Sequence, residues 1–248
     1  MTSGRIIAVA SGKGGVGKTW FAITLAHALA RERRRVLLFD ADLGLANVDI
    51  QLGLTPEHDL SAVVTGHVAL AETAVHHHEG GFAIVAGRSG SGALSSIDPA
   101  TLERTLADLR QEADRYDFIL LDLGAGLERP VRRMSAWADT LLVLATEEPT
   151  SLTDAYAVLK LHAMDRPDGD ARVVVNQAAT RQAGERTFTT LQRACLTFLG
   201  RAPGLAGIVR RDDRVRDVIR RQTLLLSRHP TCPAAADVEA AARGLLAA

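Results

Sequence analysis

Short runs of β-branched and aliphatic residues alternate with stretches of helical periodicity along the chain. Apolar runs predict strands at Arg5–Ala10, Arg35–Asp40, Phe82–Gly87, Tyr116–Leu123, Thr140–Thr146, Ala171–Asn176 and Leu205–Val209. Apolar residues spaced by three and four predict helices at Trp20–Arg33, Pro99–Arg115, Ser151–Met164, Thr187–Leu199, Arg214–Thr223 and Ala234–Leu246. The pattern predicts an α/β fold with a mostly parallel central sheet of about seven to eight strands and helices on both faces.

The alternation continues along the chain without a break in composition. Two stretches rich in loop-forming residues, Gly87–Ser96 and Met164–Asp170, are too short to separate domains. A length of 248 residues suits one large α/β domain. We therefore predict a single domain that comprises residues 1–248.

Composition excludes several classes of protein. Lys and Arg number 29, as do Asp and Glu, so no overall charge draws the chain to nucleic acid or membrane. The two cysteines, Cys195 and Cys232, form no CxxC pair, which argues against zinc and thioredoxin-type sites. No apolar run approaches the roughly 18 residues of a membrane span, and no secretory signal is present, so we expect a cytoplasmic protein, with peripheral membrane contact as an alternative. The alanine-rich tail Ala234–Ala248 is expected to dock on the domain, because it would bury little area in a membrane.

A glycine-rich loop follows the first predicted strand and opens the first predicted helix. It fits the pattern GxxxxGK[ST] and consists of Gly12, Lys13, Gly14, Gly15, Val16, Gly17, Lys18 and Thr19. Glycines let the backbone curl so that its N–H groups point inward and bind phosphate at a helix N-terminus. In such a loop Lys18 reaches the β- and γ-phosphates and the hydroxyl of Thr19 ligates Mg²⁺. The loop therefore predicts a P-loop NTPase rather than a plain glycine turn.

Carboxylates stand at the ends of two further predicted strands. Asp40 and Asp42 follow the second strand, and Asp122 ends the apolar strand Tyr116–Leu123. The carboxyl ends of parallel strands meet at the edge of the sheet where ligands bind. Asp122 has the position of the acidic residue that holds the Mg²⁺ hydration shell, and Gly124 lets the backbone approach the γ-phosphate. For Asp40 and Asp42, an Asx-type turn after a strand stays open as an alternative.

An ordinary phosphate loop does not need the second lysine, Lys13. With it, the loop resembles the deviant Walker A motif KGGxGKT of the MinD/ParA group, and Asp40–Asp49 resembles the DADxGLANxD segment of that group. The resemblance implies an ATPase with ATP and Mg²⁺ as ligands and an ATP-dependent homodimer. It also implies that Lys13 acts on the phosphates bound by the partner subunit.

The same resemblance assigns roles to other side chains. It implies that Asp40 holds Mg²⁺ through water, that Asp42 positions the attacking water, and that Asn47 lies near the nucleotide. It implies that Asn176 reads the adenine edge, which an amide can do chemically; an asparagine in a strand-to-loop turn is the alternative. Because no arginine has the spacing of an arginine finger, we expect slow, switch-like hydrolysis.

Further segments resemble the flagellar-number branch of this group, FlhG/FleN. They are Gly44–Asp49, Asp154–Tyr156 and Arg220–Gln222. The resemblance implies a regulator of flagellum placement and number whose partner is an FlhF-like GTPase or another flagellar or polar protein, and it places Asp154 near Lys13 or the dimer face. A ParA-like DNA-partitioning ATPase is the alternative, because Arg210–Arg221 is rich in arginine. Internal ion pairs on a solvated helix would explain the same arginines.

Overall fold

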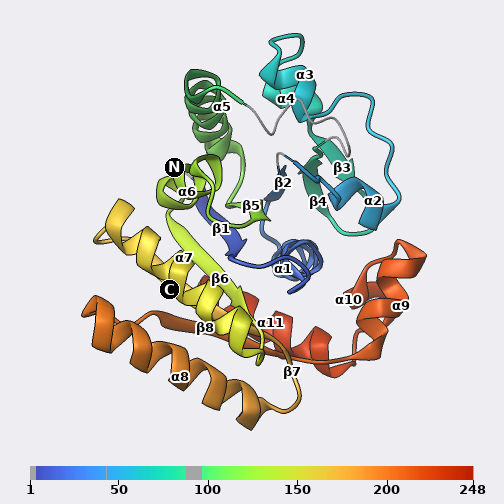
Figure 1. Ribbon diagram of the computed structural model, residues 1–248. Helices are drawn as coiled ribbons and strands as arrows, with labels where there is room; N and C mark the ends of the chain where they lie inside the picture. The colour runs from blue at the N-terminus through green and yellow to red at the C-terminus, as the bar shows by residue number, and fades with distance from the viewer. Residues whose placement is uncertain (1–3, 43, 88–96, 248) are drawn as a thin grey trace.

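A single sheet lies at the centre of the computed structural model, which describes residues 4–42, 44–87 and 97–247 (Figure 1). Its strand order is β3-β4-β2-β5-β1-β6-β7-β8, and only the β3–β4 pair is antiparallel. The strands are β1 (Arg5–Ser11), β2 (Val36–Ala41), β3 (Val75–His77), β4 (Phe82–Val85), β5 (Phe118–Ala125), β6 (Thr140–Ala145), β7 (Asp170–Ala178) and β8 (Gly204–Arg210).

Helices cover both faces of the sheet (Figure 1). One face packs against α1 (Lys18–Arg31), α2 (Val48–Leu52), α9 (Asp213–Arg221), α10 (Leu225–Arg228) and α11 (Pro233–Leu246). The other packs against α3 (Leu60–Val64), α4 (Leu70–Thr73), α5 (Pro99–Glu112), which continues into the 3₁₀ turn η1 (Ala113–Arg115), α6 (Arg129–Trp137), α7 (Pro149–Asp165) and α8 (Arg181–Leu199). The sheet is therefore buried on both sides, as its apolar strands predicted.

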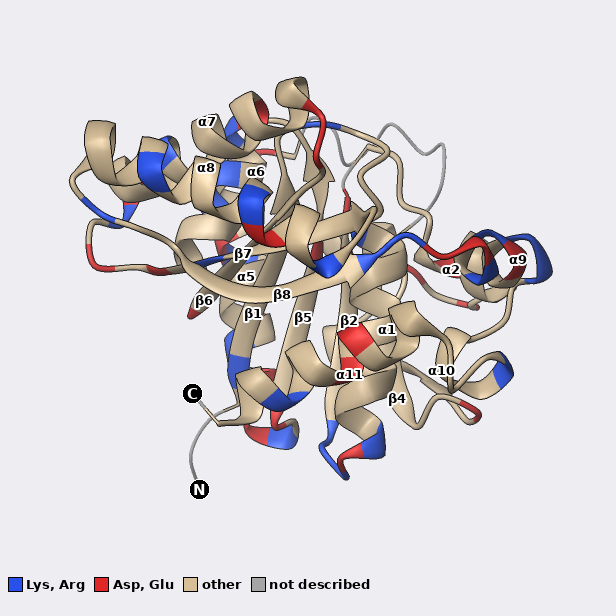
Figure 2. Cartoon of the chain, turned by 90° about the horizontal axis from the view of Figure 1, so that it is seen from below, with Lys and Arg blue, Asp and Glu red and all other residues tan. Residues whose placement is uncertain are grey.

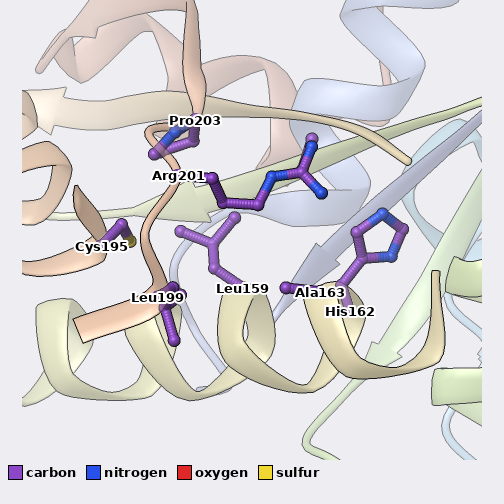
Figure 3. A pocket seen from close by; sticks show the side chains of 8 residues that line it. Leu159, His162, Ala163, Cys195, Leu199, Arg201 and Pro203 are labelled. Carbon is purple, nitrogen blue, oxygen red and sulfur yellow. The ribbon is translucent and has the colours of Figure 1, made fainter. Parts of the chain in front are cut away.

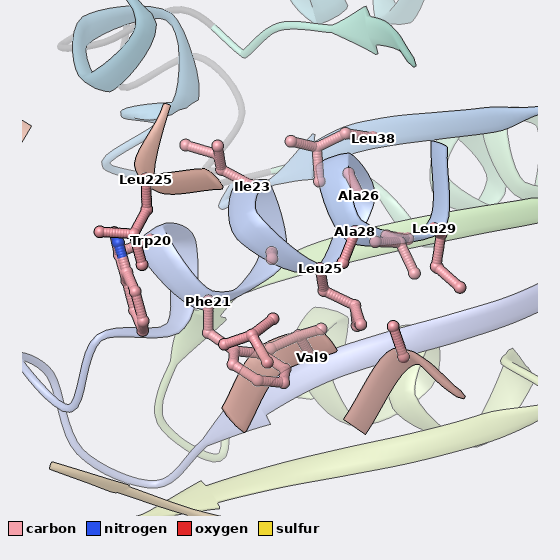
Figure 4. Packing of buried hydrophobic residues seen from close by; sticks show 14 of the residues in the cluster. Val9, Trp20, Phe21, Ile23, Leu25, Ala26, Ala28, Leu29, Leu38 and Leu225 are labelled. Atoms are coloured by element: carbon pink, nitrogen blue, oxygen red, sulfur yellow. The ribbon is translucent and has the colours of Figure 1, made fainter. Parts of the chain in front are cut away.

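The strands divide their side chains between two hydrophobic cores. In β1, Ile7 and Val9 lie in the core under α1, whereas Ile6, Ala8 and Ala10 lie in the opposite core. Successive side chains of a strand point to opposite faces, so an unbroken apolar run serves both layers. Figure 4 shows the first core, where residues of α1 pack between the sheet and α10.

The structure confirms the predicted α/β sheet with helices on both faces. All seven predicted strands are present, and the short edge strand β3 completes a sheet of eight. The short helices α2, α3, α4, α6 and α10 were not predicted, and α8 begins earlier than predicted, at Arg181. Residues 88–96 of the predicted loop Gly87–Ser96 lie outside the described residues.

The alanine-rich tail folds as α11 and docks on the domain, as predicted. Its buried side chains join the core under α1, and they include Ala234, Ala235, Val238, Ala242 and Leu245. Within the described ranges, no helix has the combined length and apolar character that a bilayer span requires.

Candidate nucleotide-binding site

The predicted site residues converge at the carboxyl ends of the central strands. The phosphate loop, Gly12–Thr19, follows β1, and Asp40 and Asp122 stand in the adjacent strands β2 and β5. Asp40 pairs with Asp122 in the β2–β5 register, and Asp122 pairs with Val9 of β1. Parallel strands thus bring the loop and both carboxylates to one edge of the sheet, where ligands of this fold class bind.

Local backbone conformation explains the glycines of the phosphate loop. Gly15 and Gly17 have φ angles of 78° and 89°, which disfavour any residue with a Cβ atom. A Cβ atom on Gly17 would also lie 2.7 Å from Nδ2 of the Asn176 side chain. Gly14 and Gly15 are exposed, and a Cβ atom on either would meet nothing within 4 Å. The loop therefore has an open side where a phosphate group can approach its backbone.

Helix α1 begins at Lys18 directly after the loop. Its N-cap residue is Gly17, and no side chain of the described residues caps the helix. The first N–H groups of a helix lack intrahelical partners and carry partial positive charge, so they suit a phosphate group. Lys18 is only 9% exposed, and burial lowers the pKa of its ammonium group, while Asp122 and Asp42 oppose that shift.

Asp122 is a fully buried carboxylate that its described neighbours compensate only in part. Neither of its oxygens has a hydrogen-bond partner among the described residues. Burial raises the pKa of Asp122 to about 8, Asp40 adds to the rise, and the neighbouring Thr19 and Lys18 oppose it. Unpartnered carboxylate oxygens beside a hydroxyl group are the donors that Mg²⁺ prefers. The residues present therefore fit a hydrated Mg²⁺ held by Thr19 and Asp122.

Asp40 organises the loop that follows β2. Its Oδ1 accepts a hydrogen bond from the backbone N–H of Asp42 at 3.2 Å, and its Oδ2 accepts from those of Asn47 and Val48 at 3.0 Å each. Burial raises the pKa of Asp40 to about 6, and these three donors oppose the rise. Asp40 thus has a structural task that the sequence did not predict, and its role toward Mg²⁺ stays a prediction. Asn47 is the N-cap of α2, and its buried Oδ1 has no partner in the described part of the chain.

Asp42 forms the Asx-type turn that was the alternative to a catalytic role. Its Oδ1 accepts from the N–H groups of Gly44 and Leu45, at 3.2 and 2.9 Å. A Cβ atom on Gly124 would lie 3.1 Å from the same oxygen, so this glycine makes room for Asp42. The turn places the carboxylate beside the phosphate loop, close enough to influence Lys18. Turn formation and positioning of a water molecule are compatible, and the latter stays a prediction.

Lys13 is bonded to the N-terminal end of α7. Its Nζ donates to Glu148 Oε2 at 2.7 Å and to the Thr150 hydroxyl at 3.3 Å. Asp154, which was expected near Lys13 or the dimer face, lies against Gly12, whose added Cβ atom would be 2.6 Å from the Asp154 carbonyl oxygen. The structure therefore places Asp154 near the loop but pairs Lys13 with Glu148, which the sequence analysis did not single out.

A cavity of about 290 Å³ opens beside the phosphate loop. Asn176 lines it, but both ends of its amide are engaged: Nδ2 donates to the Val16 carbonyl oxygen at 2.8 Å, and Oδ1 accepts from the N–H of Gln177 at 2.9 Å. Asn176 thus braces the loop, and its contact with adenine stays a prediction. Other residues that line the cavity were not predicted as site residues, and they include Trp20, Gln177, Arg211, Val215, Arg216 and Ile219. Trp20 could have been suspected, because a large aromatic residue directly follows Thr19.

A second, much smaller cavity lies between α7 and α8 (Figure 3). It has a volume of about 20 Å³, and His162, Cys195 and Arg201 contribute to its lining. Burial raises the pKa of the Cys195 thiol to about 11, so the thiol stays protonated and is a poor nucleophile. This cavity therefore offers no chemistry of its own.

The arginine-rich segment is largely neutralised by its own neighbourhood. Arg210 pairs with Asp237, Arg214 with Asp212, and Arg221 with Asp217. Charges of both signs consequently lie close together around α9 (Figure 2). Within residues 97–247, Arg211, Arg216 and Arg220 have no ion pair, and the first two line the larger cavity. The ion pairs agree with a solvated helix and weaken the case for a DNA-binding surface.

Comparisons with known proteins agree with this geometry. The CobQ/CobB/MinD/ParA nucleotide binding domain matches residues 7–225. The antiactivator FleN of Pseudomonas aeruginosa is 36% identical over 239 residues, which are 96% of this chain and 85% of that protein. The flagellum site-determining protein YlxH of Helicobacter pylori is 30% identical over 187 residues, 75% of this chain and 63% of that protein. The septum site-determining protein MinD of Pyrococcus horikoshii, solved with Mg-ADP, has the same fold, with a TM-score of 0.82 at 22% identity over 97% of this chain and 95% of that chain.

Proposed function

Because the chain belongs to the CobQ/CobB/MinD/ParA family of nucleotide-binding domains, we propose that it is an ATP-dependent switch that controls the placement and number of flagella. It is an ATPase that uses Mg²⁺ and forms a homodimer when ATP is bound. The flagellar role is supported by the likeness to FleN and YlxH over most of the chain. Its direct partner is a flagellar or polar protein such as an FlhF-like GTPase.

The observation that carries the proposal is the meeting of the phosphate loop and Asp122. The loop offers uncapped helical N–H groups to phosphates, and Asp122 offers buried, unpartnered oxygens, among the described residues, to a hydrated cation. A strand-to-helix glycine turn alone would not explain a carboxylate buried without a partner, since such a group is strongly disfavoured.

Each side chain then has a defined task. The loop backbone and Lys18 bind the phosphates, and the turn at Asp42 orients a water molecule for attack on the γ-phosphorus. Thr19 and Asp122 would hold the hydration shell of Mg²⁺, which would supply positive charge beside the phosphates when bound. Lys13 of one subunit leaves Glu148 and reaches the phosphates of the other subunit, so the ATP-bound dimer contains two complete sites.

Size-exclusion chromatography of an Asp42→Asn variant tests the switch. The amide oxygen of asparagine can still accept from Gly44 and Leu45, so the turn is kept while the carboxylate is lost. With ATP and Mg²⁺ we expect the variant to elute as a stable dimer and to hydrolyse ATP at least about tenfold more slowly than the wild type. A Lys18→Ala control should stay monomeric. An Asp42→Asn protein that binds ATP and remains monomeric would contradict the proposal.

The cellular role is tested separately by counting flagella on cells that produce the Asp42→Asn variant in place of the wild type. A changed number or position of flagella supports the proposed process. Unchanged flagella, together with ATP-dependent retention on duplex DNA at low salt, would instead favour a partitioning ATPase. We expect little retention, because the acidic neighbours of Arg210, Arg214 and Arg221 already neutralise them.

A further inference from the structure

Gln222 ends helix α9 in an unusual backbone conformation. Its φ and ψ angles are 53° and 44°, in the left-handed region. Helices usually place glycine or asparagine at this position, because a larger side chain is disfavoured there. Among the described residues, two other non-glycine residues have a positive φ angle: Arg33, and Gln177, which lines the nucleotide cavity. A disfavoured backbone persists only where its surroundings hold it, so the contacts of the Gln222 side chain matter here.

The side chain of Gln222 reaches helix α2. Its Nε2 donates to the carbonyl oxygen of Ile50 at 2.8 Å, across 172 residues of sequence. It also packs on Gly53, where an added Cβ atom would lie 3.1 Å from Gln222 Oε1. The Ile50 carbonyl oxygen also accepts from the N–H of Gly53 at 3.3 Å, and a carbonyl oxygen can accept two hydrogen bonds, so Gln222 adds a second bond at the end of α2.

The opposite end of α2 is attached to Asp40. The N–H groups of Asn47 and Val48, at the start of the helix, both donate to Asp40 Oδ2. Because α2 has only five residues, the two attachments hold nearly its whole length. A displacement of its last turn is therefore transmitted to the loop that carries Asp40 and Asp42.

Helix α9 forms part of the wall of the nucleotide cavity. Val215, Arg216 and Ile219 line that cavity, and Gln222 follows one turn later on the same helix. Trp20 also lines the cavity, and it lines a small void that Gln51, Leu52 and Ile219 share. Figure 4 shows Trp20, in the first turn of α1, beside Leu225. The base side of the site and the carboxylate side are thus in continuous contact through α9, Gln222 and α2.

We infer that Gln222 is a positioning residue that couples occupancy of the base and ribose cavity to the Asp40–Asp42 loop. A ligand in the cavity restricts the movement of α9. Through its bond to Ile50, Gln222 then restricts the end of α2 as well. A nucleotide fills the cavity and so orders residues 44–54, whereas phosphate alone leaves the cavity empty and does not order them. This inference rests on the proposed nucleotide site and adds to it a route between its two ends.

Hydrogen exchange measured by mass spectrometry tests the coupling without any turnover. Wild-type protein is compared in saturating ADP and in saturating inorganic pyrophosphate, both with EDTA so that no metal links phosphate to Asp40. We expect ADP to slow the exchange of residues 44–54 by about fivefold more than pyrophosphate does, which is the size of one net hydrogen bond. In a Gln222→Gly variant that difference should disappear.

The glycine variant separates coupling from simple loss of structure. Glycine adopts the left-handed conformation freely, so the unfolding temperature should be unchanged or raised. Gln222→Asn serves as a second variant, because asparagine also tolerates this conformation but its side chain is one methylene too short to reach Ile50. It should lose the coupling as well, whereas Arg220→Gln, two residues earlier in the chain, should keep it.

The outcomes distinguish the coupling from the nucleotide site itself. If neither ligand slows exchange in residues 11–19, the proposed nucleotide site is wrong. If both protect the phosphate loop but ADP adds nothing at residues 44–54, the coupling does not exist. If ADP adds the same protection in Gln222→Gly as in the wild type, Gln222 does not carry it. Loss of the difference in both Gln222 variants, with the phosphate loop still protected, supports the inference.

Discussion

The buried carboxyl group of Asp122 destabilises the folded protein when no cation shares its site. Its pKa in the folded state, about 8, lies above the ordinary value of 3.8 that it regains on unfolding. Between these values the folded state binds more protons than the unfolded state, so this group lowers stability progressively as the pH rises through that window. The same burial makes the group ready for Mg²⁺, because a cation replaces the missing compensation. Stability is thus lost at this position in exchange for metal binding.

Replacement of Asp122 by asparagine should therefore separate stability from function. In metal-free buffer at pH 8, we expect Asp122→Asn to raise the free energy of unfolding by roughly 2 kcal/mol or more. The variant should gain nothing further from Mg²⁺ with ATP and should lose at least about a hundredfold in hydrolysis rate. Urea unfolding at pH 5 and pH 8, with and without Mg²⁺ and ATP, measures both effects. A variant that is less stable than the wild type at pH 8 would mean that the Asp122 carboxylate is compensated within the protein.

His162 is a second buried group whose charge state depends on folding. It is 4% exposed, and neither ring nitrogen has a partner among the described residues. Burial, with help from Arg166 and Arg201, lowers its pKa to about 4. The unfolded chain takes up a proton below the ordinary value of 6.5, whereas the folded protein does so only near 4. Stability from the neutral ring is therefore present above pH 6.5 and falls as the pH falls toward 4.

We expect His162→Leu to be less sensitive to acid than the wild type. Between pH 7 and pH 5 the wild type should lose roughly 2 kcal/mol through this one histidine, and the variant should not show that part of the loss. Chemical denaturation at both pH values gives the comparison. His58→Leu, at an exposed position, is the matched control and should follow the wild type. Equal losses in the His162 variant and in the control would show that His162 is already compensated in the folded protein.

Helix α11 shows how a single ion pair fixes an element next to the site. The Asp237 side chain, 6% exposed, accepts hydrogen bonds from the backbone N–H and the guanidinium group of Arg210. Arg210 ends β8 and lines the nucleotide cavity, so α11 and the cavity wall share this pair. The pair therefore joins the end of β8 to α11 at the cavity wall.

Loss of Asp237 should affect both the helix and the cavity. We expect Asp237→Ala to lower the free energy of unfolding by about 2 kcal/mol, because a buried acceptor is removed while Arg210 remains partly exposed to water. The KM for ATP should rise several-fold, since the cavity wall is no longer fixed. Glu239→Ala, which removes a more exposed ion pair of the same helix, should cost less than about 1 kcal/mol and leave KM unchanged. If the two variants lost similar free energy of unfolding, the Arg210–Asp237 pair would stabilise the protein no more than an exposed ion pair does.

Whether an element could be predicted depended on how much of its pattern is set locally. The parallel strands are continuous apolar runs because both faces are buried, and all seven were found. Helices α2, α3 and α4 have five residues or fewer, too short to show a period. Their positions come from tertiary contacts such as the bonds from Asp40 to Asn47 and Val48. Sequence reasoning about hydrophobic period cannot see such contacts.

The residues of the candidate site also divide into those that local sequence predicts and those that only the fold brings together. The positions of the phosphate loop and of Asp122 could be predicted, because the loop is a contiguous motif and Asp122 ends an apolar strand. The partner of Lys13 could not, since Glu148 lies 135 residues away and only the fold brings them together. The engagement of Asn176 with Val16 is also set by the fold, and it replaces the simple expectation of an amide free to meet a base.

At the scale of the whole molecule, the pair between Lys13 and Glu148 opposes the proposed dimer. Lys13 cannot contact Glu148 of its own chain and the phosphates of a partner subunit at once. Both side chains are exposed, 41% for Lys13 and 65% for Glu148, so the pair is weak and screened by salt. It therefore sets a modest threshold that ATP must overcome, which suits a switch that should dimerise only when ATP is abundant.

We expect Glu148→Gln to lower this threshold. Without the negative charge, Lys13 keeps only bonds to neutral groups at position 148 and at Thr150, and the ATP concentration for half-maximal dimerisation should fall about two- to fivefold at low salt. The difference should shrink in 0.5 M salt, where charges that water reaches are screened within about 5 Å. Glu147→Gln is the matched control, because it makes the same change of charge one residue away while an amide oxygen can still accept from the N–H of Ala179. Analytical ultracentrifugation across an ATP series measures the shift. If Glu148→Gln needs more ATP than the wild type, Glu148 takes part in the dimer contact itself; if Lys13→Gln still dimerises normally, Lys13 does not act across the interface.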